Sequence, residues 1–290
     1  MEQSSKDFHV TDTKVSTEDK AVLLQATYLL AAGNLYVVTY KIYPSGIVHV
    51  NAKFTSTDMQ AAETEVSEAT RMATFTPGSD AARKAASKLE VPRIGVRFRL
   101  PAQMNNVQYF GRGPEENYID RNHGTMVGIY QTTADKMYFN YVRPQENGHH
   151  TDTRWLNLSP DKGNGLVIVA DSLIGFNALR NSVEDFDSEE ALPHPYQWNN
   201  FSPEEATNHD EKAARNVLRR MHHVNDITPR DFVEVCVDMK QQGVGGYDSW
   251  GARPEPFHQI PANREYNWGF TLVPVRSGSQ ATEATKYDYR

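Results

Sequence analysis

A chain of 290 residues is long enough for one large domain or two ordinary ones. Hydrophobic residues make up 39% and charged residues 23%, which is typical of globular proteins, and no apolar run approaches the roughly 18 residues of a membrane-spanning helix. The formal net charge of −7, without a basic block, argues against nucleic acid and anionic membranes as partners. The only cysteine, Cys236, rules out an intrachain disulfide, and its place in a predicted strand indicates a buried or half-buried thiol.

The first part of the chain predicts a disordered segment followed by a β-hairpin. Residues 1–18 are polar, and we expect them to be disordered. Apolar residues then alternate along 36–42 and again along 48–54, with Pro44-Ser45-Gly46 as turn residues between them.

Residues 58–90 interrupt this alternation with a segment rich in Ala, Glu and Lys, which indicates one or two short helices or a mobile insertion. Strands are predicted again where the alternation resumes, at residues 94–100, 107–111, 136–143, 166–179, 231–240 and 266–272. The first of these alternates with Arg93, Arg97 and Arg99, which predicts a half-buried strand with a basic outer face.

Helix signals are few. Ser202-Pro203-Glu204-Glu205 has a capping residue, a first-turn proline and a Glu at the third position, and a second helix is predicted through residues 210–221. Residues 277–290 are polar and predicted to be disordered. Many short strands and few helices predict an all-β fold, a large antiparallel β-sandwich with one or two short helices. No linker divides the strand-rich part, so residues 19–276 are expected to form one domain, with 58–90 as an insertion.

Glu115 and Glu116 are the first candidates for chemistry, since a pair of carboxylates can perform acid–base work on a glycoside. Adjacent residues in a strand point to opposite faces, so the two cannot flank one substrate, and structural roles are favoured. Ion pairs that hold this Gly-Pro turn are expected from the charged residues Arg112, Asp120 and Arg121.

Two histidine pairs resemble metal ligands superficially. His149-His150 with Asp152, and His222-His223, lack a third ligand at a useful spacing, so no metal site is expected. The chain has no Gly-x-Ser-x-Gly elbow, phosphate loop or dinucleotide fingerprint, and Cys236 has no sequence context for a nucleophile. We therefore assign no catalytic residue to this chain.

The segment Gly245-Gly246-Tyr247-Asp248-Ser249-Trp250-Gly251 is the strongest candidate for binding. Its glycines allow a tight turn and close approach to another surface, and an indole offers a flat face to the C–H groups of a sugar. Trp250 is predicted to face a ligand, with Asp248 and Ser249 beside it; the alternative is an interior Trp at the edge of the sandwich.

A second polar segment is the turn that contains Glu146, Asn147 and His149. These side chains offer acceptors and donors to sugar hydroxyls, although the same residues would also suit a satisfied turn near an interface.

Three segments together are similar to a known family: 92–95 with 109–121, 141–148 with 153–154, and 240–250. The first contains Gly111-Arg112-Gly113-Pro114-Glu115-Glu116-Asn117-Tyr118, the second Pro144-Gln145-Glu146-Asn147-Gly148, and the third Gly245-Gly246-Tyr247-Asp248-Ser249-Trp250. In this order they resemble the C-terminal domain, or small chain, of the large bacterial β-galactosidases of glycoside hydrolase family two, over residues 20–275.

The resemblance implies a supersandwich related in fold to galactose mutarotase. It also implies that the catalytic glutamates, Mg²⁺ and Na⁺ lie on other domains, chiefly a TIM barrel, and that the whole enzyme is an oligomer; no cofactor is expected in this chain. Trp250 occupies the place of a Trp that reaches into the active site as a platform for the sugar. Residues 58–90 are longer than the usual connection in the family. No signal peptide is visible, which leaves the cytoplasm and the periplasm both open.

Three hypotheses follow. In the first, the chain is a non-catalytic part of a β-galactosidase, either an excised domain or a natural small subunit, that completes the galactoside pocket of a catalytic TIM-barrel partner. The second is an independent mutarotase-like enzyme that uses His149, His150 and Glu146 as acid and base. The third is a free-standing carbohydrate-binding module.

Overall fold

The computed structural model describes residues 8–30, 33–56, 90–142, 144–186, 224, 227–246, 253–277 and 281–286. The predicted helices within 202–221, the 58–90 insertion apart from Glu90, and the 247–252 loop lie outside these residues. The strands are β1 (His9–Glu18), β2 (Ala21–Leu29), β3 (Leu35–Ile42), β4 (Val48–Thr55), β5 (Arg93–Pro101), β6 (Asn106–Gly113), β7 (Met126–Thr133), β8 (His150–Ser159), β9 (Gly165–Leu179), β10 (Phe232–Gln241) and β11 (Tyr266–Val275). Three short helical turns accompany them: η1 (Val183–Asp185), η3 (Pro256–His258) and α5 (Ala281–Ala284).

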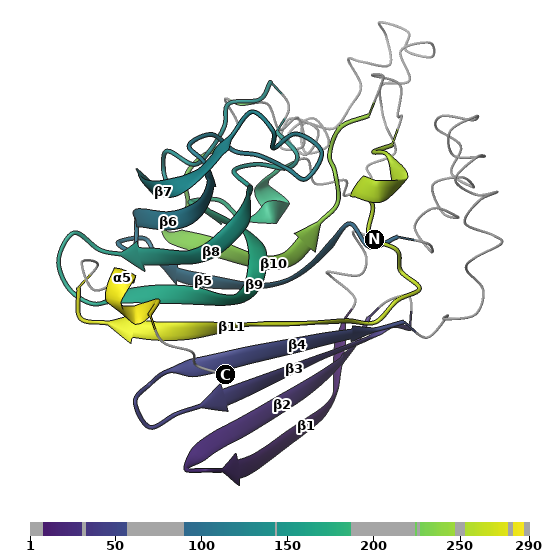
Figure 1. Ribbon diagram of the computed structural model, residues 1–290, viewed down its shortest axis with the longest axis vertical. Coiled ribbons are helices and arrows are strands. Elements are labelled where there is room, and N and C mark those ends of the chain that lie inside the picture. Colours follow the sequence, from purple (N-terminus) through teal and green to yellow (C-terminus); the bar gives the residue numbers. More distant parts are fainter. Residues whose placement is uncertain are drawn as a thin grey trace, which may run out of the picture.

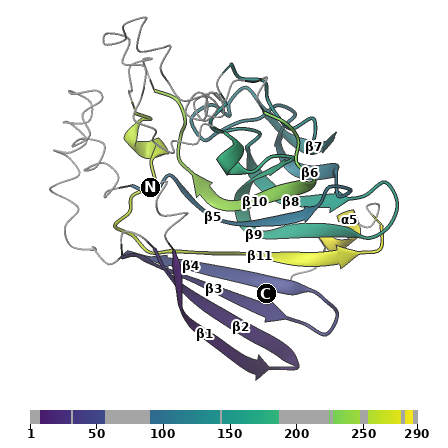
Figure 2. The same ribbon diagram turned by 180° about the vertical axis from the view of Figure 1, so that it is seen from behind.

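All these strands pair antiparallel within one curved sheet, in the order β1-β2-β3-β4-β11-β9-β8-β6-β7. β10 branches from this path because it pairs with both β5 and the second half of β9. The sheet folds back so that β5 and β10 lie over the layer formed by β1–β4 and β11 (Figures 1 and 2). The predicted antiparallel β-sandwich is therefore confirmed.

The core lies between the two layers. Val38, Val50 and Phe270 come from one layer, while Ile94 and Val235 come from the other, and all belong to one buried cluster. Alternation in each strand places these side chains on the inner face, where each large apolar residue contributes about 1.5–3 kcal/mol by leaving water.

Polar contacts also join the layers. The indole Nε1 of Trp268 donates to the Tyr36 hydroxyl over 3.2 Å, and that hydroxyl donates to the carbonyl of Gly95 over 3.2 Å. This chain of hydrogen bonds connects β5 with β3 and β11 across the two layers.

The hairpin predicted at 36–54 is confirmed as β3 and β4. Its turn closes through hydrogen bonds from the Tyr43 amide to the Ile47 carbonyl (2.9 Å) and from the Gly46 amide to the Tyr43 carbonyl (2.9 Å). Gly46 has a φ of 84°, a conformation that glycine adopts without strain.

The prediction of disorder is wrong for residues 9–18, which form β1. This strand pairs along its length with β2 through a two-residue turn, Asp19-Lys20, in which both residues have positive φ as a tight hairpin requires. Every residue of β1 is exposed, so no apolar face marks the strand in the sequence.

Two further sequence predictions need correction. Of the predicted strand 136–143, the described residues 136–142 form no strand, because both the amide and the carbonyl of Phe139 bond the side chain of Asn147 instead of a neighbouring strand. Residues 281–284, within the predicted disordered tail, form α5, and Ala284 is buried beside Trp155 and Val273.

Candidate functional site

The three motif-bearing segments meet in space at the point where the chain leaves β10. We call residues 242–246 the loop stem, because they lead into the 247–252 loop. The amide of Gly245 donates to Asp120 Oδ2 over 2.6 Å, and the amide of Gly243 donates to the carbonyl of His258 over 2.9 Å. A Cβ on Gly243 would lie 2.7 Å from the Asp120 carboxylate, so this close approach requires glycine.

The segment that follows the 247–252 loop is also bonded to the sandwich. Arg253 forms an ion pair with the buried carboxylate of Glu90, and the Gln259 side chain donates to the carbonyl of Pro254 over 2.7 Å. Both ends of the 247–252 loop are thus fixed to the sandwich. Trp250, Asp248 and Ser249 themselves lie outside the described residues.

Glu116 connects the first two motif segments. Its side chain is almost fully buried and accepts hydrogen bonds from the Gly148 amide (2.7 Å) and from the side chains of Arg121, Tyr141 and Tyr118. The predicted structural role of Glu116 is confirmed, while Glu115 is exposed.

The ion pairs expected at this turn are present for two of the three charged residues. Arg112 pairs with Asp152 over 2.5 Å, and Arg121 pairs with Glu116. Asp120 instead accepts the hydrogen bond from the loop stem described above.

Asn117 and Asn147 are structural. The Asn117 amide nitrogen donates to the carbonyls of Arg112 and Glu115 (both 3.1 Å), and its oxygen accepts from the amide and hydroxyl of Thr151. The two polar atoms of the Asn147 side chain are occupied by the backbone of Phe139 (2.8 and 2.7 Å). Asn147 is buried, so we do not include it in the proposed binding site.

His149 is enclosed, with a side chain only 3% exposed. Its ring stacks on Tyr118 with the centroids 5.5 Å apart, and it packs so closely on β9 that a Cβ on Gly175 would lie 2.5 Å from the ring. Burial, together with the positive charge of Arg93, holds the pKa of His149 well below its usual value.

His150 is also buried. Its Nδ1 lies 3.0 Å from the Gly148 carbonyl and its Nε2 lies 3.3 Å from the Pro114 carbonyl. Burial lowers the pKa of His150, so the ring is neutral at pH 7 and carries one N–H, which can satisfy only one of these carbonyls. Neither histidine is placed as an exposed acid or base, which disfavours the mutarotase-like hypothesis.

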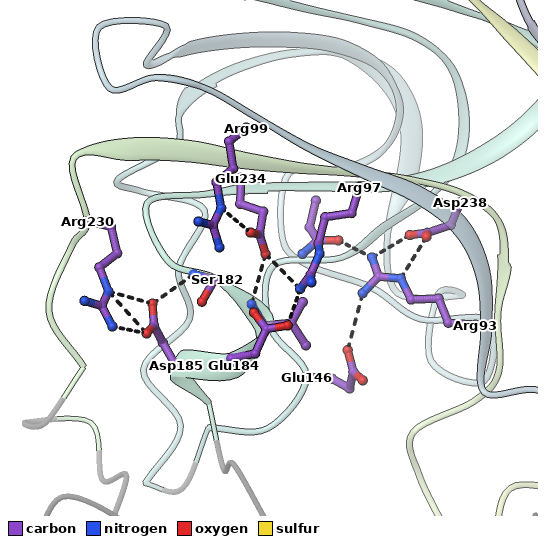
Figure 3. A network of polar contacts seen from close by, with 12 residues as sticks. Arg93, Arg97, Arg99, Glu146, Ser182, Glu184, Asp185, Arg230, Glu234 and Asp238 are labelled. Carbon is purple, nitrogen blue, oxygen red and sulfur yellow. Dashed lines mark hydrogen bonds and ion pairs between the residues drawn. The ribbon is translucent and has the colours of Figure 1, made fainter. Parts of the chain in front are cut away.

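Arg93 is the centre of a polar cluster on β5, β10 and β9 (Figure 3). Its Nε and Nη2 donate to the two carboxylate oxygens of Asp238 at 2.8 and 2.5 Å, and Nη2 also donates to Asn177. Gly95 lies opposite Asp238 across the strand pair, and a Cβ there would be 2.0 Å from Asp238 Oδ1. The missing side chain of Gly95 therefore provides the space that the carboxylate needs to reach Arg93.

Arg97 and Arg99 are exposed on the outer face of β5, as the sequence predicted, but their charges are paired with carboxylates. Glu234, on the facing strand β10, accepts from Arg99 over 2.9 Å and lies 3.4 Å from Arg97, which also pairs with Glu184 of η1 over 2.7 Å (Figure 3). Carboxylates on β10 thus neutralise the charges that β5 presents.

Glu146 differs from the other predicted contact residues because its side chain is 45% exposed. Packing on its remaining sides raises the pKa of this carboxyl by desolvation, while Arg93 and a hydrogen bond from Gln241 oppose the rise.

Two further expectations concern reactivity and metals. Cys236 is buried, and burial raises the pKa of its thiol to about 12, so the thiol is not a nucleophile at neutral pH. No cluster of three or more metal-ligating side chains occurs in the part of the chain that the structure describes, and none of its helices is long and apolar enough to cross a membrane.

Several bacterial β-galactosidases are similar to this chain in sequence. The β-galactosidase of Priestia megaterium is 34% identical over 186 residues, which cover 64% of this chain and 15% of that protein. The β-galactosidase of Streptococcus thermophilus is 26% identical over 271 residues, covering 92% of this chain and 20% of that protein. The β-galactosidase of Arthrobacter sp. strain B7 is 40% identical over 123 residues, which cover 41% of this chain and 12% of that protein.

A galactose mutarotase related enzyme from Lactobacillus acidophilus matches 92% of this chain and 71% of its own, with 8% identity and a TM-score of 0.25. That score is too low to support an argument about the fold, which rests on the strand pairing above. The chain spans no more than one fifth of the first two β-galactosidases, at 15% and 20% of their lengths. The family described as the β-galactosidase small chain matches residues 1–272, and this chain belongs to it.

Proposed function

We propose that this chain is a non-catalytic, carbohydrate-contacting part of a β-galactosidase of glycoside hydrolase family two. The enzyme hydrolyses terminal β-D-galactosides such as lactose, and this chain presents the Trp250 loop to an active site on a catalytic TIM-barrel partner. The single observation that carries the proposal is the connection of the three motif segments to one another: Gly148 donates to Glu116, and Gly245 of the loop stem donates to Asp120. A loop fixed at both ends can offer an aromatic face in one orientation, which lowers the entropy cost of binding.

In this proposal Trp250 is the platform for the sugar, and Asp248 and Ser249 shape the loop. Double displacement at a retaining glycosidase needs two carboxyl groups about 5–5.5 Å apart. Glu116 is held by four donors, which suits a structural role, so we assign the reacting carboxylates, Mg²⁺ and Na⁺ to the remainder of the oligomeric enzyme.

The test is to assay a chromogenic β-galactoside with this chain alone, with the remainder of the enzyme alone, and with both. We expect turnover to rise when the two are mixed and to be absent with this chain alone. Substantial hydrolysis by the isolated chain would reject the proposed division of labour.

A further inference from the structure

The side chains of Arg93 and Glu146 lie near the loop stem and face each other without a direct hydrogen bond. Arg93 Nη1 and Glu146 Oε2 are 3.9 Å apart, beyond hydrogen-bond distance, and their side chains are 20% and 45% exposed (Figure 3). The Nε and Nη2 atoms of Arg93 are committed to Asp238 and Asn177. Among the described residues, Nη1 therefore faces Glu146 as its nearest charged partner, across a gap that one oxygen atom can bridge.

A second, independent observation comes from Gln241, the last residue of β10. Gln241 pairs with Arg93 across the two strands and is 94% buried, at 6% relative exposure. Its side chain lies near enough to Glu146 to help lower the pKa of that carboxyl, and its buried Oε1 has no hydrogen-bond partner. A buried acceptor left without a partner costs about 1–3 kcal/mol, so folded proteins normally supply one.

His149 adds a second unsatisfied atom on the other side of the cluster. Its Nδ1 is buried without a hydrogen-bond partner and lies 3.8 Å from Asp238 Oδ2. The polar groups around Arg93 are thus incompletely satisfied on two sides, although the ion pair with Asp238 is closed.

We propose that Arg93, Glu146 and Gln241 form a second carbohydrate subsite that binds a pair of neighbouring hydroxyls of a neutral glycoside. One hydroxyl accepts from Arg93 Nη1 and donates to Glu146, which fits a 3.9 Å gap with two ordinary hydrogen bonds. The second hydroxyl donates to Gln241 Oε1, which is closed to solvent in this structure, so binding there requires the Gln241 side chain to turn outward toward Glu146. The inference rests on the proposed function, because it assumes that the ligand is the galactoside presented to the Trp250 loop.

The net charge of Arg93, Asp238 and Glu146 determines which sugars the subsite can bind. Asp238 neutralises Arg93, so the carboxylate of Glu146 leaves one net negative charge at the subsite. A phosphorylated sugar would be repelled, whereas uncharged hydroxyls can use both members of the pair. The subsite therefore takes a neutral sugar.

The experiment is lactose and galactose binding to the full chain, measured by saturation-transfer NMR and calorimetry, with galactose 6-phosphate as the charged competitor. Glu146→Ala and Gln241→Leu should each weaken lactose binding by about fivefold or more, as expected for one or two lost hydrogen bonds. The matched control is Glu265→Ala, because Glu265 is 47% exposed and pairs with Lys53 on the other layer; this variant should bind like wild type. Galactose 6-phosphate should bind more weakly than galactose.

The pattern across variants separates the two proposals. If Trp250→Ala retains lactose binding while Glu146→Ala loses it, the subsite stands and the platform role of Trp250 fails. If Glu146→Ala and Gln241→Leu both bind like wild type and keep the wild-type circular dichroism spectrum, the subsite is rejected and the platform is untouched. Absence of binding to the wild-type chain at the highest soluble lactose concentration also overturns the subsite.

Discussion

Acidification should destabilise the folded chain through His149. The ring is buried and its pKa is lowered well below the usual value, whereas in the unfolded chain it titrates near pH 6.5. Below about pH 6.5 the unfolded state therefore binds more protons than the folded state, and the free energy of unfolding falls as the pH falls. His150 acts in the same direction, because burial lowers its pKa as well.

The size of the effect follows from linkage. One pKa unit corresponds to about 1.4 kcal/mol, so a change from about pH 7.5 to about pH 5.5 should cost roughly 1.3 kcal/mol for a histidine that stays neutral when folded. His149 should contribute this full amount and His150 at most the same. Glu90 and Glu146 have raised pKa values, so they add to the free energy of unfolding as the pH falls and oppose the effect of the histidines. This contribution is the same in wild type and in the histidine variants, so it cancels when the two are compared.

The assay is urea unfolding at both pH values for wild type, His149→Asn and the control His123→Asn. His123 is exposed, so its replacement removes an imidazole without disturbing a buried contact. His149→Asn should reduce the loss of stability between the two pH values by roughly 1.3 kcal/mol, whatever its own baseline stability. An identical pH dependence in wild type and His149→Asn would refute the reasoning.

Three substitutions test the contacts around the site. Gly243→Ala places a methyl group 2.7 Å from Asp120, so it should lower the activity of the assembled enzyme with little change in the melting temperature of the chain; unchanged activity would contradict the role of the loop stem. Asn117→Ala removes a fully buried amide with four hydrogen bonds and should destabilise by about 2–4 kcal/mol in urea unfolding, and a loss below about 1 kcal/mol would show that these bonds contribute little. Gly95→Ala drives a methyl group into Asp238 and separates it from Arg93, so about 3–5 kcal/mol should be lost by the same measurement; wild-type stability would mean that the carboxylate can move freely.

The parts of the fold that the sequence predicts are those where one face of a strand is buried. β3, β4, β10 and β11 show alternating apolar residues because their inner faces build the core. β1 escapes prediction because both of its faces are exposed, and its pairing depends on a two-residue turn with positive φ at Asp19 and Lys20.

The polar cluster could be predicted only in part. The alternation of Arg93, Arg97 and Arg99 is visible in the sequence, and Glu234 and Asp238 alternate with apolar residues in β10. These side chains pair only because β5 and β10 are neighbouring strands. The two strands are far apart in the sequence, with Arg99 and Glu234 separated by 135 residues. A local sequence pattern contains no information about such a pairing. The exposure of Glu146 and the burial of Asn147 and His149, close together in the same turn, likewise follow from tertiary packing.

The central claim concerns the indole of Trp250, and the most direct measurement is kcat/KM for a nitrophenyl β-galactoside in the assembled enzyme. Trp250→Ala should lower kcat/KM by about fivefold or more, since an aromatic platform contributes about 1 kcal/mol or more to sugar binding, and Trp250→Phe should restore part of the loss. A Trp250→Ala enzyme with wild-type kcat/KM, fully assembled by size-exclusion chromatography, would contradict the account.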